Sequence, residues 1–147
     1  METYLTELLN HKGTDVFSIP PDTNVQEAAD KMRQKKIGAL LVMRGDDLLG
    51  IFTERDILTK VVAKGIDPSS IKVSRIMTKK VVVIDPRRTV REAMQIVTER
   101  RLRHLPIVKD GKLIGMLSGG DLTRSIVAEA EGFIDTLYEY IHGSYPV

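Results

Sequence analysis

Two short motifs place a hydroxyl residue and a carboxylate at the same spacing. The chain contains Gly-Ile-Phe-Thr-Glu-Arg-Asp, ending at Asp56, and sixty-five positions later Gly-Met-Leu-Ser-Gly-Gly-Asp, ending at Asp121. In each motif a hydroxyl residue, Thr53 or Ser118, ends an apolar run three positions before the carboxylate. A carboxylate accepts hydrogen bonds from alcohols, and the start of a helix favours an anion. The motifs therefore predict binding of a ligand that carries both alcohols and a charged group, such as a sugar phosphate.

A structural role accounts for some of the same residues. Aspartate is favoured near helix N-termini, where its carboxylate accepts backbone N–H bonds. For a single Thr-x-x-Asp this capping role would be the favoured interpretation, whereas two copies in one register favour ligand binding, and one residue can serve in both. Gly50 and Gly115 either allow close strand packing or contact the ligand. Arg55 and Arg103 are either phosphate ligands or solvated charges.

The motifs belong to a longer internal repeat. Residues 16–63 align with residues 81–128 at a constant offset of sixty-five and without a gap. Chance does not usually preserve register over that length, so the chain contains two copies of one structural unit. The identical pairs include Ile19 with Ile84, Pro21 with Pro86, Glu27 with Glu92, and Leu40 with Leu105.

Each copy is predicted to fold as strand, helix, strand, strand, helix. A short β-branched run, at 16–19 or 81–84, predicts the first strand. The helix that follows starts with the spacing of a capping box. Two apolar runs around a polar turn then predict an antiparallel hairpin, and the last helix begins near the motif aspartate. The capping pairs are Asn24 with Glu27 and Thr89 with Glu92, and the hairpins span 39–52 and 104–117.

Two such units are expected to pack about a pseudo-twofold axis as an α+β fold with two clefts between the copies. The tail carries an apolar stripe that exceeds what the last repeat needs, compatible with one long helix or a break near Gly132, and it predicts an oligomer contact. The predicted boundaries are a lead-in with a short helix at 1–15, repeat 1 at 16–65, a linker with one helical turn at 66–80, repeat 2 at 81–130 and the helical tail at 131–147.

The composition argues against several classes of function. The chain has 147 residues, a net charge of +2 and no cysteine. The near balance of charge argues against a dedicated nucleic-acid-binding protein, and the lack of cysteine excludes thiolate catalysis and cysteine zinc sites. The first residues do not form a secretory signal, and no apolar run reaches the roughly 20 residues of a membrane helix. We expect a cytoplasmic protein without membrane insertion and without a catalytic constellation.

The repeat resembles a tandem pair of cystathionine-β-synthase (CBS) domains, known as a Bateman module. The similarity depends on the paired glycine-apolar-x-Thr/Ser-x-x-Asp motifs, on a leading segment of the Val-Ile-Met-Thr type, and on Leu-Pro-Ile-Val at 105–108, and it extends from about Asp15 to Glu129. The resemblance implies that AMP, ADP, ATP, NAD(H) or S-adenosylmethionine binds in the clefts between the repeats. It also implies dimerisation and regulation of an attached or separate enzyme or transporter.

The resemblance also implies roles for single residues. Asp56 and Asp121 match aspartates that accept hydrogen bonds from the ribose 2′- and 3′-hydroxyls, and Thr53 and Ser118 match the hydroxyl residues on the ribose-phosphate side. Each cleft is expected to combine the motif of one repeat with the first-helix start and second strand of the other. Asp56 is then expected to face Ala93, Leu102, Arg103 and His104, and Asp121 to face Thr23, Ala28, Ile37, Gly38 and Ala39.

These assignments predict a difference in charge between the clefts. Side chains with planar hydrogen-bond donors for phosphate oxygens gather near Asp56. Small residues near Asp121 instead leave space for a ligand and expose backbone amides to it, with less charge. The hypothesis is that the Asp56 cleft prefers the more highly phosphorylated ligand. The donors are Arg55, Arg103, and His104 or Arg88, and the small residues are Gly119, Gly120, Gly38 and Ala39.

The expected function is that of a regulatory sensor of adenine nucleotides, with AMP or ATP as the favoured ligand. It would act as a homodimer on a partner enzyme or transporter and would not itself be an enzyme. NAD(H) and S-adenosylmethionine remain alternative ligands, and no metal is expected beyond Mg with ATP. Two other classes stay open, namely a protein-interaction scaffold without a ligand and a nucleic-acid-binding protein.

Overall fold

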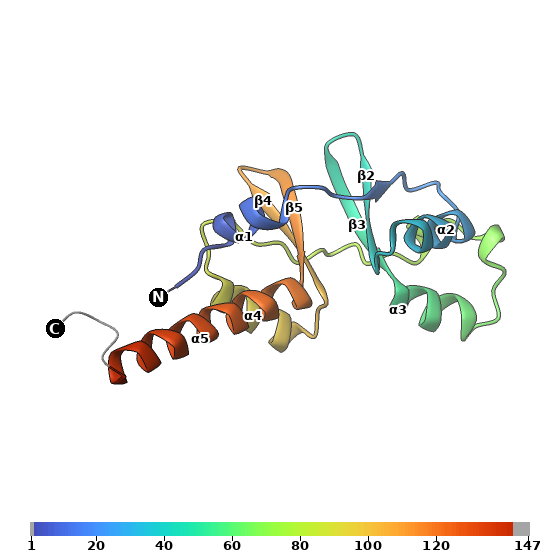
Figure 1. The fold of residues 1–147 in the computed structure, drawn as a ribbon. Helices are drawn as coiled ribbons and strands as arrows, with labels where there is room; N and C mark the ends of the chain where they lie inside the picture. The colour runs from blue at the N-terminus through green and yellow to red at the C-terminus, as the bar shows by residue number, and fades with distance from the viewer. Residues whose placement is uncertain (1, 143–147) are drawn as a thin grey trace. The chain divides into compact units, whose positions relative to one another are not determined.

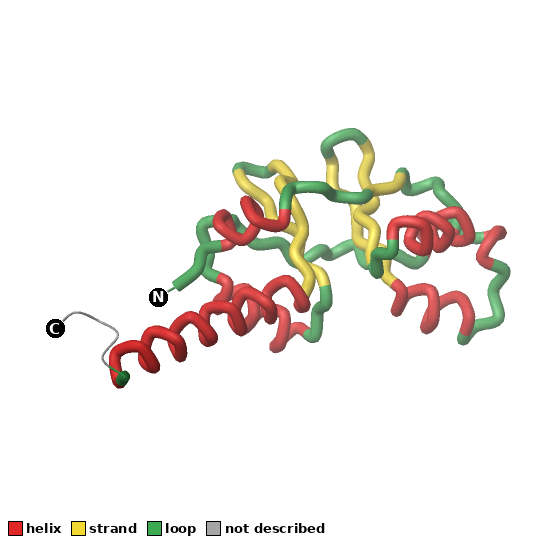
Figure 2. The backbone as a smooth tube through the Cα atoms, viewed as in Figure 1, coloured by secondary structure: helices red, strands yellow, loops and turns green. Residues whose placement is uncertain are grey.

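The computed structural model describes residues 2–142, which form two compact units with mixed helices and strands. The repeat-1 unit comprises Asp15–Val82 together with the Asp110–Leu113 turn. The repeat-2 unit comprises the chain before Asp15, Val83–Lys109 and the chain from Ile114 onward. Figures 1 and 2 show the elements of both units.

The repeat-1 unit is built on a three-stranded sheet in the order β1-β2-β3. Strand β1 pairs parallel to β2, and β2 pairs antiparallel to β3 with Ala39 opposite Thr53. The predicted hairpin is confirmed, with an irregularity in register between Val42 and Met43. The last helix begins as α3 and continues as a π-helical turn. The elements are β1 (Ser18–Ile19), α2 (Val25–Lys35), β2 (Ala39–Arg44), β3 (Asp47–Thr53), α3 (Glu54–Ile57), and the turns η1 (Leu58–Val62), η2 (Pro68–Ser70) and η3 (Val73–Arg75).

The repeat-2 unit contains a hairpin of two strands, with helices before and after it. The predicted hairpin is again confirmed, and the long helix that follows it passes through Gly132 without a break (Figure 1). The elements are α1 (Leu5–Lys12), α4 (Val90–Arg100), β4 (His104–Lys109), β5 (Lys112–Ser118) and α5 (Gly119–Ile141).

The strand expected at 81–84 is reduced to a single parallel bridge between Ile84 and Ile107. In repeat 1 the N–H of Leu41 donates to the carbonyl of Phe17 and extends the pairing of β1 with β2. The equivalent of Leu41 in repeat 2 is Pro106, which has no N–H and cannot make this bond. One proline therefore explains why the two copies differ in their sheets.

Both capping predictions are confirmed. The side chain of Asn24 accepts the N–H of Glu27 at 2.9 Å, and α2 begins one residue after Asn24. The side chain of Thr89 accepts the N–H of Glu92 at 3.1 Å, and α4 begins in the same way. Each cap satisfies a backbone donor that the helix itself leaves unpaired.

Each repeat is completed by the segment that precedes the other repeat in the chain. The N–H of Val90, at the start of α4, donates to the carbonyl of Thr3 at 2.8 Å, so the lead-in is part of the repeat-2 unit. The N–H of Val25, at the start of α2, donates to the carbonyl of Ile71 at 2.9 Å, so the linker is part of the repeat-1 unit. The two donors occupy equivalent positions in the repeats, since Val25 and Val90 are sixty-five positions apart.

The core of the repeat-1 unit lies between the sheet and its helices. Phe52 is fully buried in it, and Val73 from the linker turn contributes to the same cluster. Burying one such side chain contributes about 1.5–3 kcal/mol. The cluster consists of Ile19, Val25, Ala28, Met32, Leu40, Val42, Phe52, Val61, Val73 and Ile76.

From Val127 to its end, α5 leaves large apolar residues exposed in the single chain. Val127, Ile134, Leu137, Tyr138 and Ile141 are all exposed. Within the described residues, no helix is both long enough and apolar enough to span a bilayer.

Candidate functional site

Both motif aspartates are held by a reciprocal capping box. In repeat 1 the N–H of Thr53 donates to Asp56 Oδ2 at 2.9 Å, and the N–H of Asp56 donates to Thr53 Oγ1 at 3.4 Å. In repeat 2 the N–H of Ser118 donates to Asp121 Oδ2 at 2.8 Å, and the N–H of Asp121 donates to Ser118 Oγ at 3.1 Å. The capping role that the sequence allowed is therefore present in both copies, and it fixes where each carboxylate lies.

The two carboxylates are buried, with exposed fractions of 6% for Asp56 and 8% for Asp121. A buried carboxylate requires paired charges or hydrogen bonds to offset its lost hydration. Besides the capping bonds, each aspartate has a lysine partner that also donates to a backbone carbonyl. These partners are the part of the site that sequence reasoning missed.

In repeat 1 the partner of the aspartate is Lys60. Its ammonium lies 2.9 Å from Asp56 Oδ1 and 2.8 Å from the carbonyl oxygen of Ile76. Lys60 is four positions after Asp56 on the same helical stretch, a spacing that brings side chains together. The contact between Lys60 and Asp56 could therefore have been predicted from the sequence.

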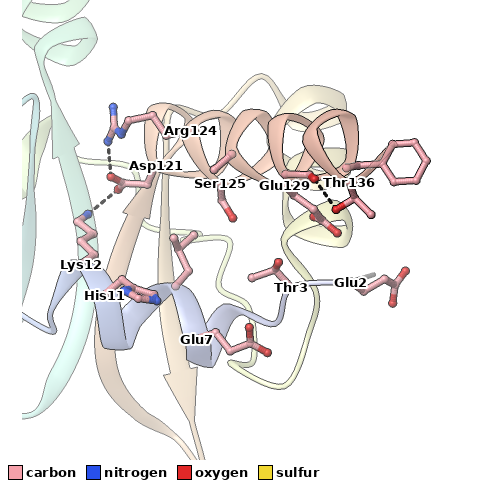
Figure 3. Close-up of a pocket in the computed structure, with 14 residues that line it drawn as sticks. Glu2, Thr3, Glu7, His11, Lys12, Asp121, Arg124, Ser125, Glu129 and Thr136 are labelled. Atoms are coloured by element: carbon pink, nitrogen blue, oxygen red, sulfur yellow. Dashed lines mark hydrogen bonds and ion pairs between the residues drawn. The ribbon is translucent and has the colours of Figure 1, made fainter. Parts of the chain in front are cut away.

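In repeat 2 the carboxylate has two cationic partners from different parts of the chain. Lys12, the last residue of α1, places its Nζ 2.6 Å from Asp121 Oδ2 and 2.8 Å from the carbonyl oxygen of Met116. Arg124 places a guanidinium nitrogen 2.6 Å from Asp121 Oδ1. Figure 3 shows both side chains pointing to the carboxylate from opposite sides. The Arg124 contact follows from helix spacing, whereas no local pattern links Lys12 to Asp121.

The surroundings of Asp121 have two opposing effects on its pKa. Burial raises the pKa of Asp121, but hydrogen bonds from Lys12 and from the Ser118 N–H, with the charge of Lys12, hold the pKa below its usual value. The carboxylate is therefore ionised at neutral pH and remains an acceptor.

Each motif also lies beside the start of the second strand of its own repeat. The N–H of Glu54 donates to the carbonyl of Gly38 at 3.1 Å, and the N–H of Gly119 donates to the carbonyl of Arg103 at 2.8 Å. The structure thus brings Gly38 and Ala39 next to the Asp56 motif and Arg103 next to the Asp121 motif. The pairing of each aspartate with the other repeat stays a prediction.

The two aspartates differ in their direct contacts with cations. Among the described ion pairs Asp121 has two cationic partners and Asp56 has one, so direct contacts place more positive charge at Asp121. Lys12 could not be linked to Asp121 from the sequence, because the two residues are far apart along the chain. The expected gathering of Arg55 and Arg103 around the Asp56 cleft stays a prediction. Arg55 and Arg103 are exposed side chains.

The remaining predicted site residues vary in burial. Ala28 and Ala93 are completely buried on the inner faces of α2 and α4, so their side chains contribute to packing. Ile37 is half-buried against the repeat-1 core, Thr23 accepts a backbone hydrogen bond from Val73, and His104 is half-buried. Direct contact of these residues with a ligand stays a prediction.

The glycines that open the motifs are needed for close packing. A Cβ atom at Gly50 would lie 2.6 Å from Met77 Sδ and 2.8 Å from the Thr78 carbonyl oxygen. A Cβ atom at Gly115 would lie 2.8 Å from Leu9 Cδ2. The packing interpretation thus accounts for both residues.

A groove of about 1070 Å³ lies between α1 and α5 in the repeat-2 unit. Asp121, Lys12 and Arg124 lie together at one end of it, whereas Glu2 and Thr136 line the other end (Figure 3). Glu7 and Glu129 also line the groove. The positive charge is thus confined to the end that contains the motif carboxylate.

Across residues 2–142, no group of three or more His, Cys, Asp or Glu side chains could hold a metal ion.

The chain matches the CBS domain family twice, over residues 9–63 and 73–128. It is 40% identical over 129 residues to the mitochondrial CBS domain-containing protein CBSX3 of Arabidopsis thaliana, covering 84% of this chain and 63% of that protein. It is 35% identical over 109 residues to the CBS domain-containing protein YhcV of Bacillus subtilis, covering 74% and 77% of the two chains.

Solved structures agree with the fold. The CBS-domain-containing protein ATU1752 of Agrobacterium tumefaciens has a TM-score of 0.80 at 39% identity, with 84% of this chain and 98% of that chain covered. The CBS domain structure NE2398 has a TM-score of 0.82 at 42% identity, covering 85% and 98%. A hexameric CBS-CP12 protein from cyanobacteria has a TM-score of 0.74 at 31% identity, covering 84% and 71%. The chain therefore belongs to the CBS-domain family and contains a pair of CBS repeats.

Proposed function

We propose that this protein is a regulatory module that binds an adenine nucleotide through Asp56 and Asp121 and acts as a homodimer on a partner protein. The observation that supports this function most directly is the pair of buried carboxylates, one in each repeat, held in the same capping geometry. The CBS pair is a regulatory and generally ligand-binding module, which agrees with this choice.

The chemistry of the two carboxylates suits a ribose. An ionised carboxylate can accept hydrogen bonds from two neighbouring hydroxyls, and each bond to a charged group contributes about 1.5–3 kcal/mol. The lysine beside each carboxylate supplies a donor for a phosphate oxygen. AMP and ATP carry both features, and NAD(H) and S-adenosylmethionine remain the alternative adenosyl ligands.

The homodimer is supported by the spacing of exposed apolar residues on α5. Five of these residues recur at alternating steps of three and four, the heptad pattern of a coiled-coil seam. The first position of each heptad is β-branched, and Leu137 occupies the fourth, a combination that favours two parallel strands. The seam consists of Val127, Ala130, Ile134, Leu137 and Ile141.

A melting screen tests the nucleotide function. We expect AMP, ADP or ATP to raise the melting temperature, because a ligand at 100 times its Kd adds about 2.7 kcal/mol to the free energy of unfolding. NAD(H) and S-adenosylmethionine belong in the same screen. The variant with both Asp56→Asn and Asp121→Asn should lose the shift. No shift with any adenosine ligand would instead indicate a scaffold, and salt-sensitive retention on DNA or RNA would indicate a nucleic-acid-binding protein.

A further inference from the structure

The acceptor positions that a ribose would need on Asp121 are largely taken by the chain itself. Oδ2 accepts the Ser118 N–H and Lys12 Nζ, and Oδ1 accepts the Arg124 guanidinium. A carboxylate has about four lone-pair sites, so these three bonds leave about one for a ligand. Two ribose hydroxyls therefore cannot bind without displacing at least one cation.

The packing of α1 in the repeat-2 unit places Lys12 beside Asp121. Leu5 and Leu9 anchor α1 in the core of the repeat-2 unit. Leu9 contacts Gly115 at the start of the motif, so closely that a Cβ atom there would lie 2.8 Å from Leu9 Cδ2. This contact brings the end of α1, and with it Lys12, to the C-terminal end of β5, where the motif carboxylate lies.

The two cations at this end outnumber the single carboxylate that they contact. Asp121 contributes one negative charge, and Lys12 and Arg124 contribute two positive charges. The lysine side chain is 37% exposed and the arginine side chain 73% exposed, so both can turn toward a new partner. A neutral diol that took their place on the carboxylate would remove this ion pair and leave Lys12 only its bond to the Met116 carbonyl, whereas a phosphate on the same ligand would supply a new anionic partner for both cations.

We propose that Lys12 and Arg124 make the Asp121 site specific for a nucleoside monophosphate, by an exchange in which ribose hydroxyls replace them on the carboxylate and the phosphate becomes their partner. This inference rests on the proposed nucleotide function. The groove beyond this end is lined by Glu2 and Glu7. Their carboxylates repel further phosphates, which limits the site to one phosphate.

The test is calorimetric titration of adenosine, AMP and ATP into a protein that carries Asp56→Asn, so that only the Asp121 site retains its carboxylate. We expect AMP to bind more tightly than either adenosine or ATP. Lys12→Met should weaken AMP by about ten- to a hundredfold, the range for one charge-assisted hydrogen bond. The same substitution should leave adenosine affinity equal or higher, since adenosine no longer has to displace the lysine.

Further variants separate this exchange from a structural role of Lys12. Lys12→Arg should retain AMP binding, and Arg124→Gln, at an exposed side chain, should reproduce the loss of AMP selectivity without affecting folding. Lys64→Met removes an exposed lysine of the repeat-1 unit and should change nothing. A parallel loss of AMP and adenosine in Lys12→Met, matched by unchanged selectivity in Arg124→Gln, would overturn the exchange.

The outcomes also distinguish this inference from the proposed function. If the Asp56→Asn protein binds AMP and adenosine but Lys12→Met leaves their ratio unchanged, the exchange is wrong and the nucleotide function stands. If ATP binds more tightly than AMP, the assignment to a monophosphate is wrong. If the protein binds none of the three, nucleotide binding at Asp121 fails, and the exchange fails with it.

Discussion

At the scale of single residues, Asp121 serves in two ways that both depend on its negative charge. Its carboxylate caps α5 through the Ser118 N–H, and it pairs with Lys12 and Arg124. Its pKa lies below the usual value because these hydrogen bonds outweigh the effect of burial. A carboxyl group with a lowered pKa in the folded state stabilises the fold while it is ionised.

The sign of this effect predicts how stability changes with pH. The contribution of Asp121 is complete above about 3.9, the usual pKa of aspartate, and is lost as the pH falls through its lower pKa in the folded state. Asp121→Asn should therefore reduce the free energy of unfolding by about 1–3 kcal/mol at pH 7. Urea unfolding of both proteins from pH 7 to pH 3 should show this difference shrinking below about pH 4. A difference that grows toward low pH would contradict the prediction.

Gly115 allows a prediction about packing. Gly115→Ala should lower the free energy of unfolding by about 1–3 kcal/mol, because the new Cβ atom would lie 2.8 Å from Leu9 Cδ2. Leu9→Ala opens a cavity and destabilises on its own, but in the double variant it should remove this clash. Chemical denaturation of the four proteins measures the coupling, and additive losses would show that the two sites do not contact each other.

At the scale of elements, the two repeats differ because of single residues within a common plan. Pro106 removes the N–H that would continue the first strand in repeat 2, while Leu41 keeps it in repeat 1. The last helix is the other difference, since α3 passes into the π-helical turn η1 whereas α5 runs for 23 residues. The longer helix supplies the exposed seam.

Gly132 lies inside α5 with no atom within 4 Å of the position of an added Cβ. Gly132→Ala should therefore raise the free energy of unfolding by about 0.5–1 kcal/mol, because alanine loses less backbone entropy in a helix. Gly65→Ala is the matched control. Gly65 has a φ of +64°, which alanine adopts only with strain, so this variant should be less stable. Thermal unfolding of both variants checks the prediction, which fails if Gly132→Ala melts at a lower temperature than the original protein.

At the scale of the whole molecule, α5 is expected to join two copies. Its seam offers two heptads, which is short for an independent coiled coil, so we expect the helix to contribute to a larger dimer contact. A charged residue in the seam would have to lose its hydration on pairing, whereas a charge on the opposite face would stay in water.

Ile134→Asp should therefore shift the protein from dimer to monomer, which sedimentation equilibrium measures directly. Glu139→Lys changes the charge on the face of α5 away from the seam and should leave the dimer intact. If Ile134→Asp has the same mass in solution as the original protein, the seam is not the contact. Because the substituted side chain is exposed in the single chain, the monomer should remain folded.

The sequence by itself determined those features that depend on residues close together along the chain. The caps at Asn24 and Thr89 and the two hairpins could be predicted, because helix and strand periods repeat within a few residues. The repeat register and the spacing of the two motifs could be predicted because the two copies align without a gap. The i,i+4 partner of Asp56, Lys60, also lay within reach of such an argument.

Only the tertiary structure decided which distant segments complete each site. Lys12 is 109 positions from Asp121, and Met77 and Leu9 explain the motif glycines only because they pack on Gly50 and Gly115. The lead-in belongs to the repeat-2 unit and the linker belongs to the repeat-1 unit. No periodic pattern in the sequence encodes these contacts. The physical reason is that these contacts are selected by burial and charge pairing in three dimensions, whereas sequence patterns record only local geometry.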